Sequence, residues 1–485
     1  MTDRRLIPGR VVRVPTSRRT RLTALIVACA LFMQTLDSTV IATALPTMAR
    51  AFNSDPVHMN AALTSYLLSL AVFIPASGWA ADRFGTRTIF RAAIAVFTIG
   101  SVLCGRADSL LFLIFSRILQ GLGGAMMVPV GRLVLLRTAP KSELIAAMAW
   151  LSVPAMLGPV IGPPLGGFIV TYFSWRWIFD INVPIGLLGI ALVTLFVDDV
   201  RDPTPSRFDW LGLVLSGVSL AGLMFAFETA GRDLMPPLAT ASIIGTGLLA
   251  AAGYAWHARR HPHPLLDFSL MRIRTFGVSV AAGTLFRVGI GAIPFLLPML
   301  LQLDFGQTAV ESGLITFASS AGALIMKPVA QTVLAHFGFR QTLVWNGVFA
   351  AGSLGALAAF RPTWPLAVIY AVLLIGGFSR SLQFTAYNAL AYADIPRAAM
   401  SAATSLYSTI QQLSLTFGIA AGAASLETSM ALAHHSHPSL DDFSIAFAVV
   451  AAISLLGAPL SAAMPRAAGD ELTGRGSGAV AAERR

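Results

Sequence analysis

Residues 78–91, GWAADRFGTRTIFR, form a short charged connection between two long apolar runs. Residues 334–343, LAHFGFRQTL, also join two apolar runs, much later in the chain. Aligned on Phe84 and Phe337, the two segments share the pattern Phe-Gly-x-Arg. Their equivalent positions predict an internal repeat, and a membrane protein built from repeated halves indicates a transporter.

The composition indicates that lipid is the solvent for most of the chain. Of the 485 residues, 55% are hydrophobic and only 12% are charged, whereas about 25% of the residues in a typical soluble domain are charged. Because a helix needs roughly 20 apolar residues to cross a bilayer, we expect an all-α integral membrane protein with fourteen transmembrane helices. The expected spans are 22–46, 60–81, 89–104, 109–131, 144–172, 174–197, 208–227, 238–256, 276–303, 311–335, 342–360, 363–390, 401–427 and 442–464.

The basic residues fall mainly on one side of the expected membrane. With the amino terminus inside, five of the 34 Lys and Arg residues lie on outer loops and four lie within spans, which leaves 25 on cytoplasmic segments. This positive-inside bias predicts that both termini are cytosolic. Topology then explains the net charge of +11, and we expect no binding to nucleic acid.

The order of the spans predicts two bundles with a pair of helices inserted between them. Six spans precede the pair and six follow it, which fits two six-helix bundles related by pseudo-two-fold symmetry. The expected division is a basic cytosolic tail (1–21), an amino-terminal bundle (22–197), two inserted spans (208–256), a cytosolic linker (257–275), a carboxy-terminal bundle (276–464) and a cytosolic tail (465–485). The first tail has no small-residue cleavage site, so we expect no removable signal peptide.

An acidic side chain lies near the middle of the first span. Asp37 shares a helical face with Gln34 and Ser38. An ionised carboxylate at the bilayer centre costs about 2.5–3.5 kcal/mol, so Asp37 must face protein, water or a cation, or stay protonated. Arg117 in the fourth span also needs a partner, because a guanidinium keeps its proton, and Asp37 is the obvious candidate. A carboxylate that gains and loses a proton suits proton coupling; the alternative is a buried structural Asp.

The fifth span contains LGPVIGPPLGGFIV, in which glycines recur every four residues with prolines between them. Glycine at each turn allows a neighbouring helix to approach closely, and proline permits bending. A bendable helix against a close neighbour favours a gate, and simple tight packing is the alternative. The residues of this expected motif are Gly158, Pro159, Gly162, Pro163, Gly166 and Gly167.

These motifs resemble those of the major facilitator superfamily, in particular its fourteen-span drug:proton antiporters of the EmrB/QacA type. The family's loop motif reads GxLADRxGRRxxL, and this chain matches it at Gly78, Asp82, Arg83, Gly85 and Arg87. LDSTVIATALP, RILQGLGGAMMVP and GPVIGPPLGG resemble its motifs in the first, fourth and fifth spans. The resemblance implies that the loop residues form a cytoplasmic gate, with Asp82, Arg83 and Arg87 holding the halves together in the outward-facing state. The chain departs from the family pattern at Ala80, Thr86, Thr88 and Asp180.

Polar side chains mark single faces of the later spans, which is typical of a water-filled path. Helix packing is the alternative, because transmembrane helices also associate through polar side chains. The residues expected to line a substrate cavity are Gln34, Arg287, Lys327, Arg380, Gln383, Tyr387, Asn388 and Gln411.

We expect no metal site and no cofactor. The linker carries His257, His261 and His263 without an accompanying cluster of carboxylates or cysteines, and metal sites in proteins depend on such clusters. The phosphate-binding pattern GxxxxGK[ST] does not occur, so the proton motive force rather than ATP is the expected energy source. No nucleophile with a His and carboxylate partner stands out, which argues against an enzyme.

The sequence therefore predicts a secondary transporter of a bacterial inner membrane that exports a small molecule in exchange for protons. The family resemblance implies that its substrates are amphipathic drugs or toxic small molecules. We expect small molecules, protons and lipid as its partners and a monomeric state, with an adaptor protein left open. One alternative is a dedicated exporter or importer of a single metabolite. A second is a membrane sensor or scaffold that no longer transports. Asp180 and Glu228 are the next carboxylates to consider for coupling.

Overall fold

The structure, a computed structural model, describes residues 17–52, 56–201, 206–229, 236–435 and 437–473. Over these ranges the chain forms helices and turns and no strand, which agrees with the expected all-α class. Twelve of the described helices are long and apolar enough to cross a membrane. The other two expected spans coincide with α6 (Leu144–Tyr172, 29 residues) and α9 (Trp210–Thr229, 20 residues), and the count of fourteen stays a prediction.

The helices follow the expected order along the chain. The first group is α1 (Arg18–Ala51), α2 (Pro56–Phe73), η1 (Ile74–Ala76), α3 (Ser77–Phe84), α4 (Thr86–Gly105), α5 (Leu110–Thr138), η2 (Lys141–Glu143), α6 (Leu144–Tyr172), α7 (Trp177–Asp180) and α8 (Asn182–Phe196). The inserted pair is α9 (Trp210–Thr229) and α10 (Pro237–Ala258). The last group is η3 (Phe268–Arg272), α11 (Arg274–Leu303), α12 (Ala309–Phe337), α13 (Phe339–Gly355), η4 (Ala356–Ala359), α14 (Leu366–Leu390), η5 (Arg397–Ala399), α15 (Met400–Ala433), α16 (Leu440–Leu455), α17 (Gly457–Ala462) and α18 (Asp470–Thr473).

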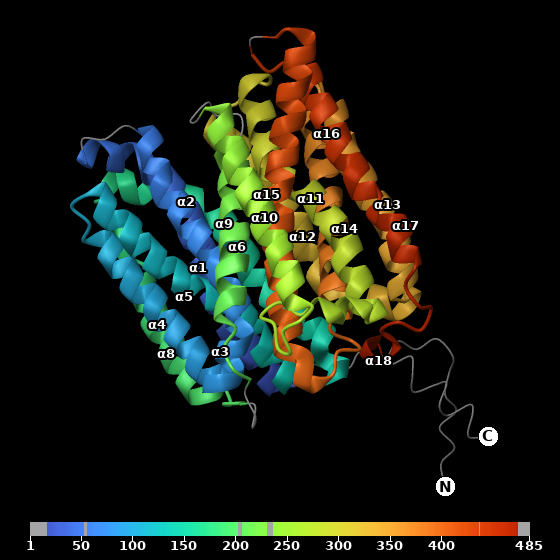
Figure 1. The fold of residues 1–485 in the computed structure, drawn as a ribbon. Helices are drawn as coiled ribbons and strands as arrows, with labels where there is room; N and C mark the ends of the chain where they lie inside the picture. Colours follow the sequence, from blue (N-terminus) through green and yellow to red (C-terminus); the bar gives the residue numbers. More distant parts are fainter. Residues whose placement is uncertain (1–16, 53–55, 202–205, 230–235, 436, 474–485) are drawn as a thin grey trace.

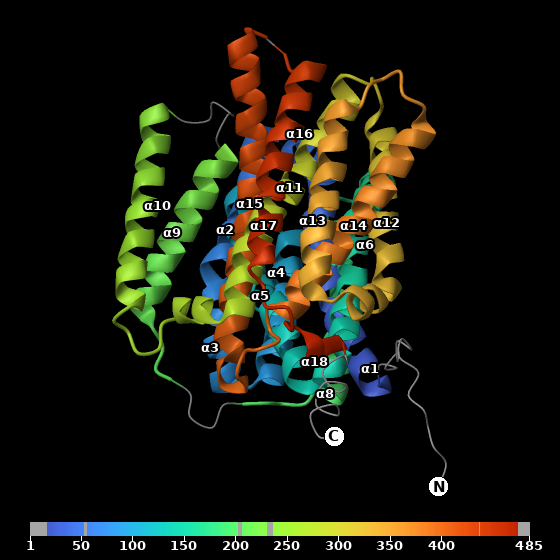
Figure 2. The same ribbon diagram turned by 90° about the vertical axis from the view of Figure 1, so that its right-hand side faces the viewer.

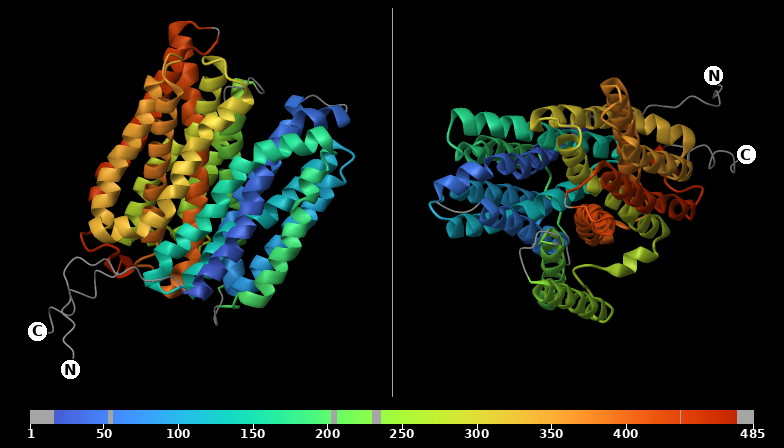
Figure 3. Two further views of the ribbon diagram at one scale, coloured as in Figure 1. Left: turned by 180° about the vertical axis from the view of Figure 1, so that it is seen from behind. Right: turned by 90° about the horizontal axis from the view of Figure 1, so that it is seen from above.

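The first and last groups form two bundles that lean apart at one end and meet at the other (Figures 1 and 3). We call the end where they meet the lower end, which holds Ser17 and α18, and the opposite end the upper end. The inserted pair lies against the outside of the bundles (Figure 2), where α9 contacts both α2 and α15.

The buried apolar residues show the same asymmetry. One cluster crosses from bundle to bundle and includes Val130 and Leu133 of α5 together with Ala403 and Leu406 of α15. The upper parts of the two bundles have separate clusters instead, one around Phe179 and one around Phe443. The hydrophobic effect, which scales with the apolar area removed from water, therefore joins the bundles through their lower halves.

The predicted repeat has a local structural basis in two glycines. Gly85 joins α3 to α4 with φ of 94°, and Gly338 joins α12 to α13 with φ of 79°. A side chain is strained at such angles, whereas glycine adopts them readily. The shared Phe-Gly-x-Arg pattern therefore marks the same sharp reversal between two helices in each bundle.

Polar contacts fix both ends of the described chain to η2, the connection between α5 and α6, at the lower end. Ser17 donates from its backbone N–H to Glu143 Oε2 at 3.1 Å, and Lys141 Nζ donates to Glu471 at 2.7 Å. Burial acts to raise the pKa of Glu143, but hydrogen bonds from Thr20 and Ser17 hold that pKa below its ordinary value. The beginning of α1 and the end of the described chain thus lie on the same face of the molecule.

Candidate functional site

A fully buried ion pair links α1 to α5 inside the amino-terminal bundle. Arg117 Nη1 donates to Asp37 Oδ2 at 2.7 Å, and neither side chain has any solvent exposure. The other carboxylate oxygen, Oδ1, accepts hydrogen bonds from Gln120 at 2.9 Å and from Asn182 at 3.0 Å. The prediction that Asp37 is the partner of Arg117 is confirmed. Both oxygens of the carboxylate are thus hydrogen-bonded inside the bundle.

The guanidinium of Arg117 also contacts α2. It lies 4.2 Å from the centroid of the Tyr66 ring, and its Nε donates to the Ala62 carbonyl at 3.2 Å. A cation over an aromatic face is attracted by the ring quadrupole, more strongly where water is excluded. Four helices, α1, α2, α5 and α8, therefore meet at this pair.

Two members of the network were not predicted. Gln120 follows Arg117 by three residues, which places both on one helical face, and that spacing was the available signal. Asn182 is a polar residue at the start of a nearly apolar helix. Gln34, predicted to line the cavity, lies beside Gly124 of α5, where a Cβ would be 3.6 Å from the Gln34 amide nitrogen.

The glycines of α6 pack directly on the turns of α1 that flank Asp37. A Cβ at Gly158 would overlap Thr35, and a Cβ at Gly162 would overlap Thr39. Thr39 Oγ1 also lies 3.3 Å from the Gly158 carbonyl oxygen. The close helix contact expected from this motif is therefore present, with α1 as the neighbour.

The remaining members of the motif differ in their surroundings. Gly166 is buried, whereas a Cβ at Gly167 would have no atom within 4 Å. Gly167 is therefore not part of the groove, although the motif included it. The side chains of Pro159 and Pro163 lie outside the described residues.

A polar contact connects the two bundles at the lower end. Asp82 at the end of α3 accepts a hydrogen bond from Ser401 of α15 and one from Arg137 of α5 at 2.5 Å. A Cβ at Gly78 would lie 2.7 Å from the Ser401 carbonyl oxygen, so α3 and α15 touch closely there. Arg137 was not predicted, because a basic residue at a cytoplasmic helix end reads as a topology signal.

The other predicted gate residues, Arg83, Gly85 and Arg87, do not take part in this contact between the bundles. The Arg87 backbone N–H donates to Asp199 at 3.2 Å, and a Cβ at Gly85 would overlap the same carboxylate, so both face the segment that follows α8. Arg83 is exposed. Within the described structure, Gly78 and Asp82 contact the opposite bundle, and Arg137 supplies the cation that was assigned to Arg83 and Arg87.

A second connection between the bundles runs through Arg132 of α5, which is 6% exposed. Its guanidinium donates to Gln411 at 3.2 Å and to Tyr392 at 3.3 Å, and it lies 5.5 Å from the Tyr407 ring. Gln411 was predicted as a cavity residue, whereas Arg132 was not, since it sits one residue beyond the expected fourth span. The structure shows that this end of α5 is buried between the bundles.

Three further cations are buried in the carboxy-terminal bundle. Arg287 donates to Tyr407, Lys327 donates to Thr385 at 3.1 Å, and Arg380 donates to Ser319 at 2.8 Å. None of these three, nor Arg132, forms an ion pair with a described Asp or Glu. Buried cations normally have a compensating anion, and hydroxyl groups supply only partial compensation here.

The remaining predicted cavity residues bond mostly to neighbouring helices. Gln383 donates to the Leu343 carbonyl at 2.8 Å and to Tyr387 at 3.2 Å, and Tyr387 lies 2.7 Å from Ser461. Asn388 donates to a carbonyl of its own helix. Helix packing, the alternative considered from the sequence, describes the contacts of Gln383 with Leu343 and of Tyr387 with Ser461.

The two other carboxylates that were considered for proton coupling are Asp180 and Glu228. Asp180 is at the upper end, where its side chain is 23% exposed and lies 3.3 Å from Arg106. The side chain of Glu228 lies outside the described residues. Both cysteines are free. Among the described carboxylates, Asp37 is the one near the middle of a long helix.

Comparisons with known proteins identify the family. A model of the Major Facilitator Superfamily matches residues 27–419. The chain belongs to this superfamily. It is therefore a multi-pass membrane transporter.

Named relatives and solved structures of the superfamily agree with that assignment. A protein of Pectobacterium atrosepticum with the provisional name multidrug resistance protein MdtD is 41% identical over 398 residues, which are 81% of this chain and 84% of that protein. MdtD of Escherichia coli O6:H1 is 39% identical over 412 residues, or 84% of this chain and 86% of that protein.

Among solved structures, the human organic anion transporter MFSD10 has a TM-score of 0.65 at 14% identity, covering 91% of this chain and 99% of its own. The proton:xylose symporter XylE has a TM-score of 0.64 at 16% identity, covering 95% and 98%. At this identity both confirm the superfamily fold and nothing finer.

Proposed function

We propose that the protein is a proton-coupled antiporter that exports amphipathic drugs or toxic small molecules by alternating access. The buried pair of Asp37 and Arg117 carries the proposal, because it places a titratable carboxylate in the middle of a long helix at the junction of four helices. The names of the MdtD relatives support drugs as the cargo.

Protonation of Asp37 would remove the charge that compensates Arg117. Removing one partner of a buried ion pair costs about 3–5 kcal/mol, which is enough to change which conformation is favoured. The turns of α1 on either side of Asp37 pack against the glycines of α6. A shift of α1 on protonation would therefore reach α6 directly, and α6 contacts α12 and α14 of the other bundle.

The orientation follows from the basic residues. If the lower end is cytosolic, as the positive-inside rule predicts, the joined lower halves make this the outward-facing state of a bacterial inner-membrane protein. Both termini would then be cytosolic. The long helices α6 and α9 would complete fourteen spans, with two six-helix bundles that rock as units. The carrier would work as a monomer, without a cofactor, on the proton motive force.

A second candidate function is the export of a single anionic metabolite. The four buried cations without an acidic partner favour it, since an organic anion bound near Arg287 and Arg132 would supply the missing compensation. A permanently charged cation would instead meet repulsion there. Charge of the cargo therefore separates the two candidates.

Uptake into everted membrane vesicles tests both candidates in one assay. Vesicles energised to an acidic interior would be offered ethidium as a cation and carboxyfluorescein as an anion, with and without an uncoupler. Uncoupler-sensitive uptake of ethidium supports the drug antiporter, and uptake of carboxyfluorescein alone supports the metabolite exporter. Failure to move a broad panel of both charges would favour the sensor or scaffold.

A further inference from the structure

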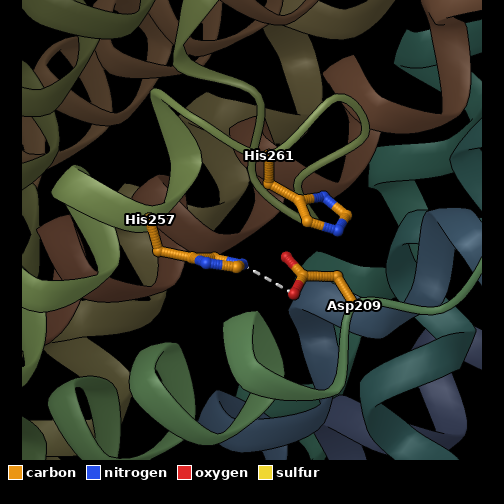
Figure 4. Close-up of side chains that lie close together, drawn as sticks. All are labelled: Asp209, His257 and His261. Carbon is orange, nitrogen blue, oxygen red and sulfur yellow. Dashed lines mark hydrogen bonds and ion pairs between the residues drawn. The ribbon is translucent and has the colours of Figure 1, made fainter.

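Three side chains converge at the lower end of the inserted helix pair (Figure 4). Asp209 immediately precedes α9, His257 lies in the last turn of α10, and His261 lies in the loop that follows. One ligand atom from each of the three lies within 4.8 Å of the others. His257 Nε2 is 2.8 Å from Asp209 Oδ1.

Local structure holds each of these residues in place. Asp209 Oδ1 accepts the Gly212 backbone N–H at 2.8 Å, so the carboxylate caps the start of α9. The loop after α10 is fixed because Tyr254 accepts the Leu266 backbone N–H at 2.6 Å. His261 Nδ1 lies 3.3 Å from the His263 backbone nitrogen. A ring that binds a metal through Nε2 carries its proton on Nδ1, so metal binding would replace this weak hydrogen bond.

The second carboxylate oxygen is the decisive feature. The Asp209 side chain is 2% exposed, and its Oδ2 has no hydrogen-bond partner among the described residues. Capping and the bond to His257 need only Oδ1. A buried acceptor without a hydrogen-bond partner destabilises the folded protein. In Figure 4 this oxygen points toward the His261 ring.

We propose that Asp209, His257 and His261 form a binding site for Zn²⁺. Two imidazole nitrogens and one carboxylate oxygen are a ligand set that zinc takes in proteins, with water in the fourth position. Zinc–nitrogen bonds of about 2.0–2.1 Å require ligand atoms roughly 3.3 Å apart in a tetrahedron. The three residues need only a small closure of the His261 loop to reach that spacing.

No cluster of carboxylates or cysteines was expected around the linker histidines, and the structure brings one carboxylate, Asp209, to two of them. Asp209 and His257 are separated by the whole length of α9 and α10, and the antiparallel packing of these helices brings the two residues together. A bound Zn²⁺ would tie the inserted pair to the linker that leads into α11.

Cobalt(II) spectroscopy on the full-length detergent-purified protein tests the site. The affinity tag is removed first. His435 lies beside Asp442 at the upper end, and it is replaced by Ala in every variant so that this second pair cannot bind the added metal. We expect one equivalent of Co²⁺ to give the visible absorption of a tetrahedral site and Zn²⁺ to displace it. His261→Ala should weaken the affinity for Zn²⁺ at least tenfold.

Matched variants separate coordination from folding. His263→Ala removes an exposed neighbouring histidine and should leave the absorption unchanged. Asp209→Ser keeps an oxygen that can cap α9 but removes a metal ligand, so it should weaken Zn²⁺ binding without loss of the folded protein. Absence of the tetrahedral absorption, or an equal signal in His261→Ala, overturns the proposal.

Discussion

At the scale of single residues, Asp37 differs from every other described carboxylate in combining a mid-helix position with three directed donors. Asn at this position imitates the protonated side chain and has no proton to exchange. We expect Asp37→Asn to abolish uphill efflux while downhill exchange of substrate continues, because rocking does not itself require the charge. Transport in proteoliposomes with and without a pH gradient measures both activities.

Two controls accompany that variant. Asp180→Asn alters a partly exposed carboxylate at the upper end and should leave coupling intact. Because loss of a buried ion-pair partner costs about 3–5 kcal/mol, monodispersity in detergent must first show that Asp37→Asn is folded. Asp37 would be excluded as the coupling residue if the Asn variant still pumped uphill and still dissipated a pH gradient.

The sequence was informative at residues whose chemistry conflicts with lipid. Asp37 and Arg117 were predicted because a charge in the middle of an apolar run is costly wherever the helix lies. Arg132 and Arg137 were missed because the end of a span is an ordinary place for arginine. Whether such an end is exposed or buried between bundles depends on tertiary packing, which local sequence does not encode.

At the scale of secondary-structure elements, the contact of α6 with α1 depends on the absence of side chains at two positions. Gly162→Leu should insert normally but lose most efflux, since the new side chain would collide with Thr39. Gly167→Leu is the matched control, because nothing lies within 4 Å of the position of its Cβ. Efflux rates normalised to the amount of protein in the membrane compare the two.

Equal efflux by the two leucine variants would remove the gating interpretation of the α6 motif. If Gly162→Leu failed to reach the membrane, the substitution to Ala would provide a milder test, with a smaller expected loss of activity. Overpacking a close contact typically costs about 1–3 kcal/mol.

The hydrophobic runs predicted the positions of the helices along the chain, but they did not predict the breaks within spans or the exact helix ends. The expected span 60–81 is interrupted by η1, where Pro75 cannot donate a backbone hydrogen bond. The expected span 174–197 divides into α7 and α8 at Ile181. Several helices also extend beyond the apolar runs, because a helix can continue past the hydrocarbon once its backbone is hydrogen-bonded internally.

At the scale of the whole molecule, Asp82 is the carboxylate through which α3 contacts the opposite bundle. Asp82→Lys would place a cation beside Arg137 and remove the acceptor for Ser401. We expect turnover to fall about tenfold or more, which corresponds to roughly 1.4 kcal/mol, with little change in substrate affinity. Binding and transport assays on the reconstituted protein separate these two quantities.

Arg83→Glu reverses an exposed charge of the same loop and is the matched control for that experiment. The structure predicts normal turnover for it, whereas the family resemblance predicts a defect. Normal turnover in Asp82→Lys would show that the contact with Ser401 does not limit the cycle.

The two bundles and the inserted pair could be predicted from the order of the spans. The conformational state could not, because a transporter presents the same sequence in all its states. The conformational state is identified by contacts between the bundles, such as the hydrogen bond that the Ser405 hydroxyl donates to the Pro75 carbonyl oxygen at 2.7 Å.

The position of α9 bears on how molecules dissolved in the lipid reach the protein. Leu220 and Met224 pack with Ala71 of α2 and Leu413 of α15, and so occupy the seam between the two bundles on that side. A lipophilic compound that diffuses within one leaflet finds this lateral entrance closed by a helix, with α10 as a second barrier. The opposite seam, where α6 contacts α12 and α14, is not covered by the inserted pair, so we expect compounds dissolved in the lipid to approach the protein from that side.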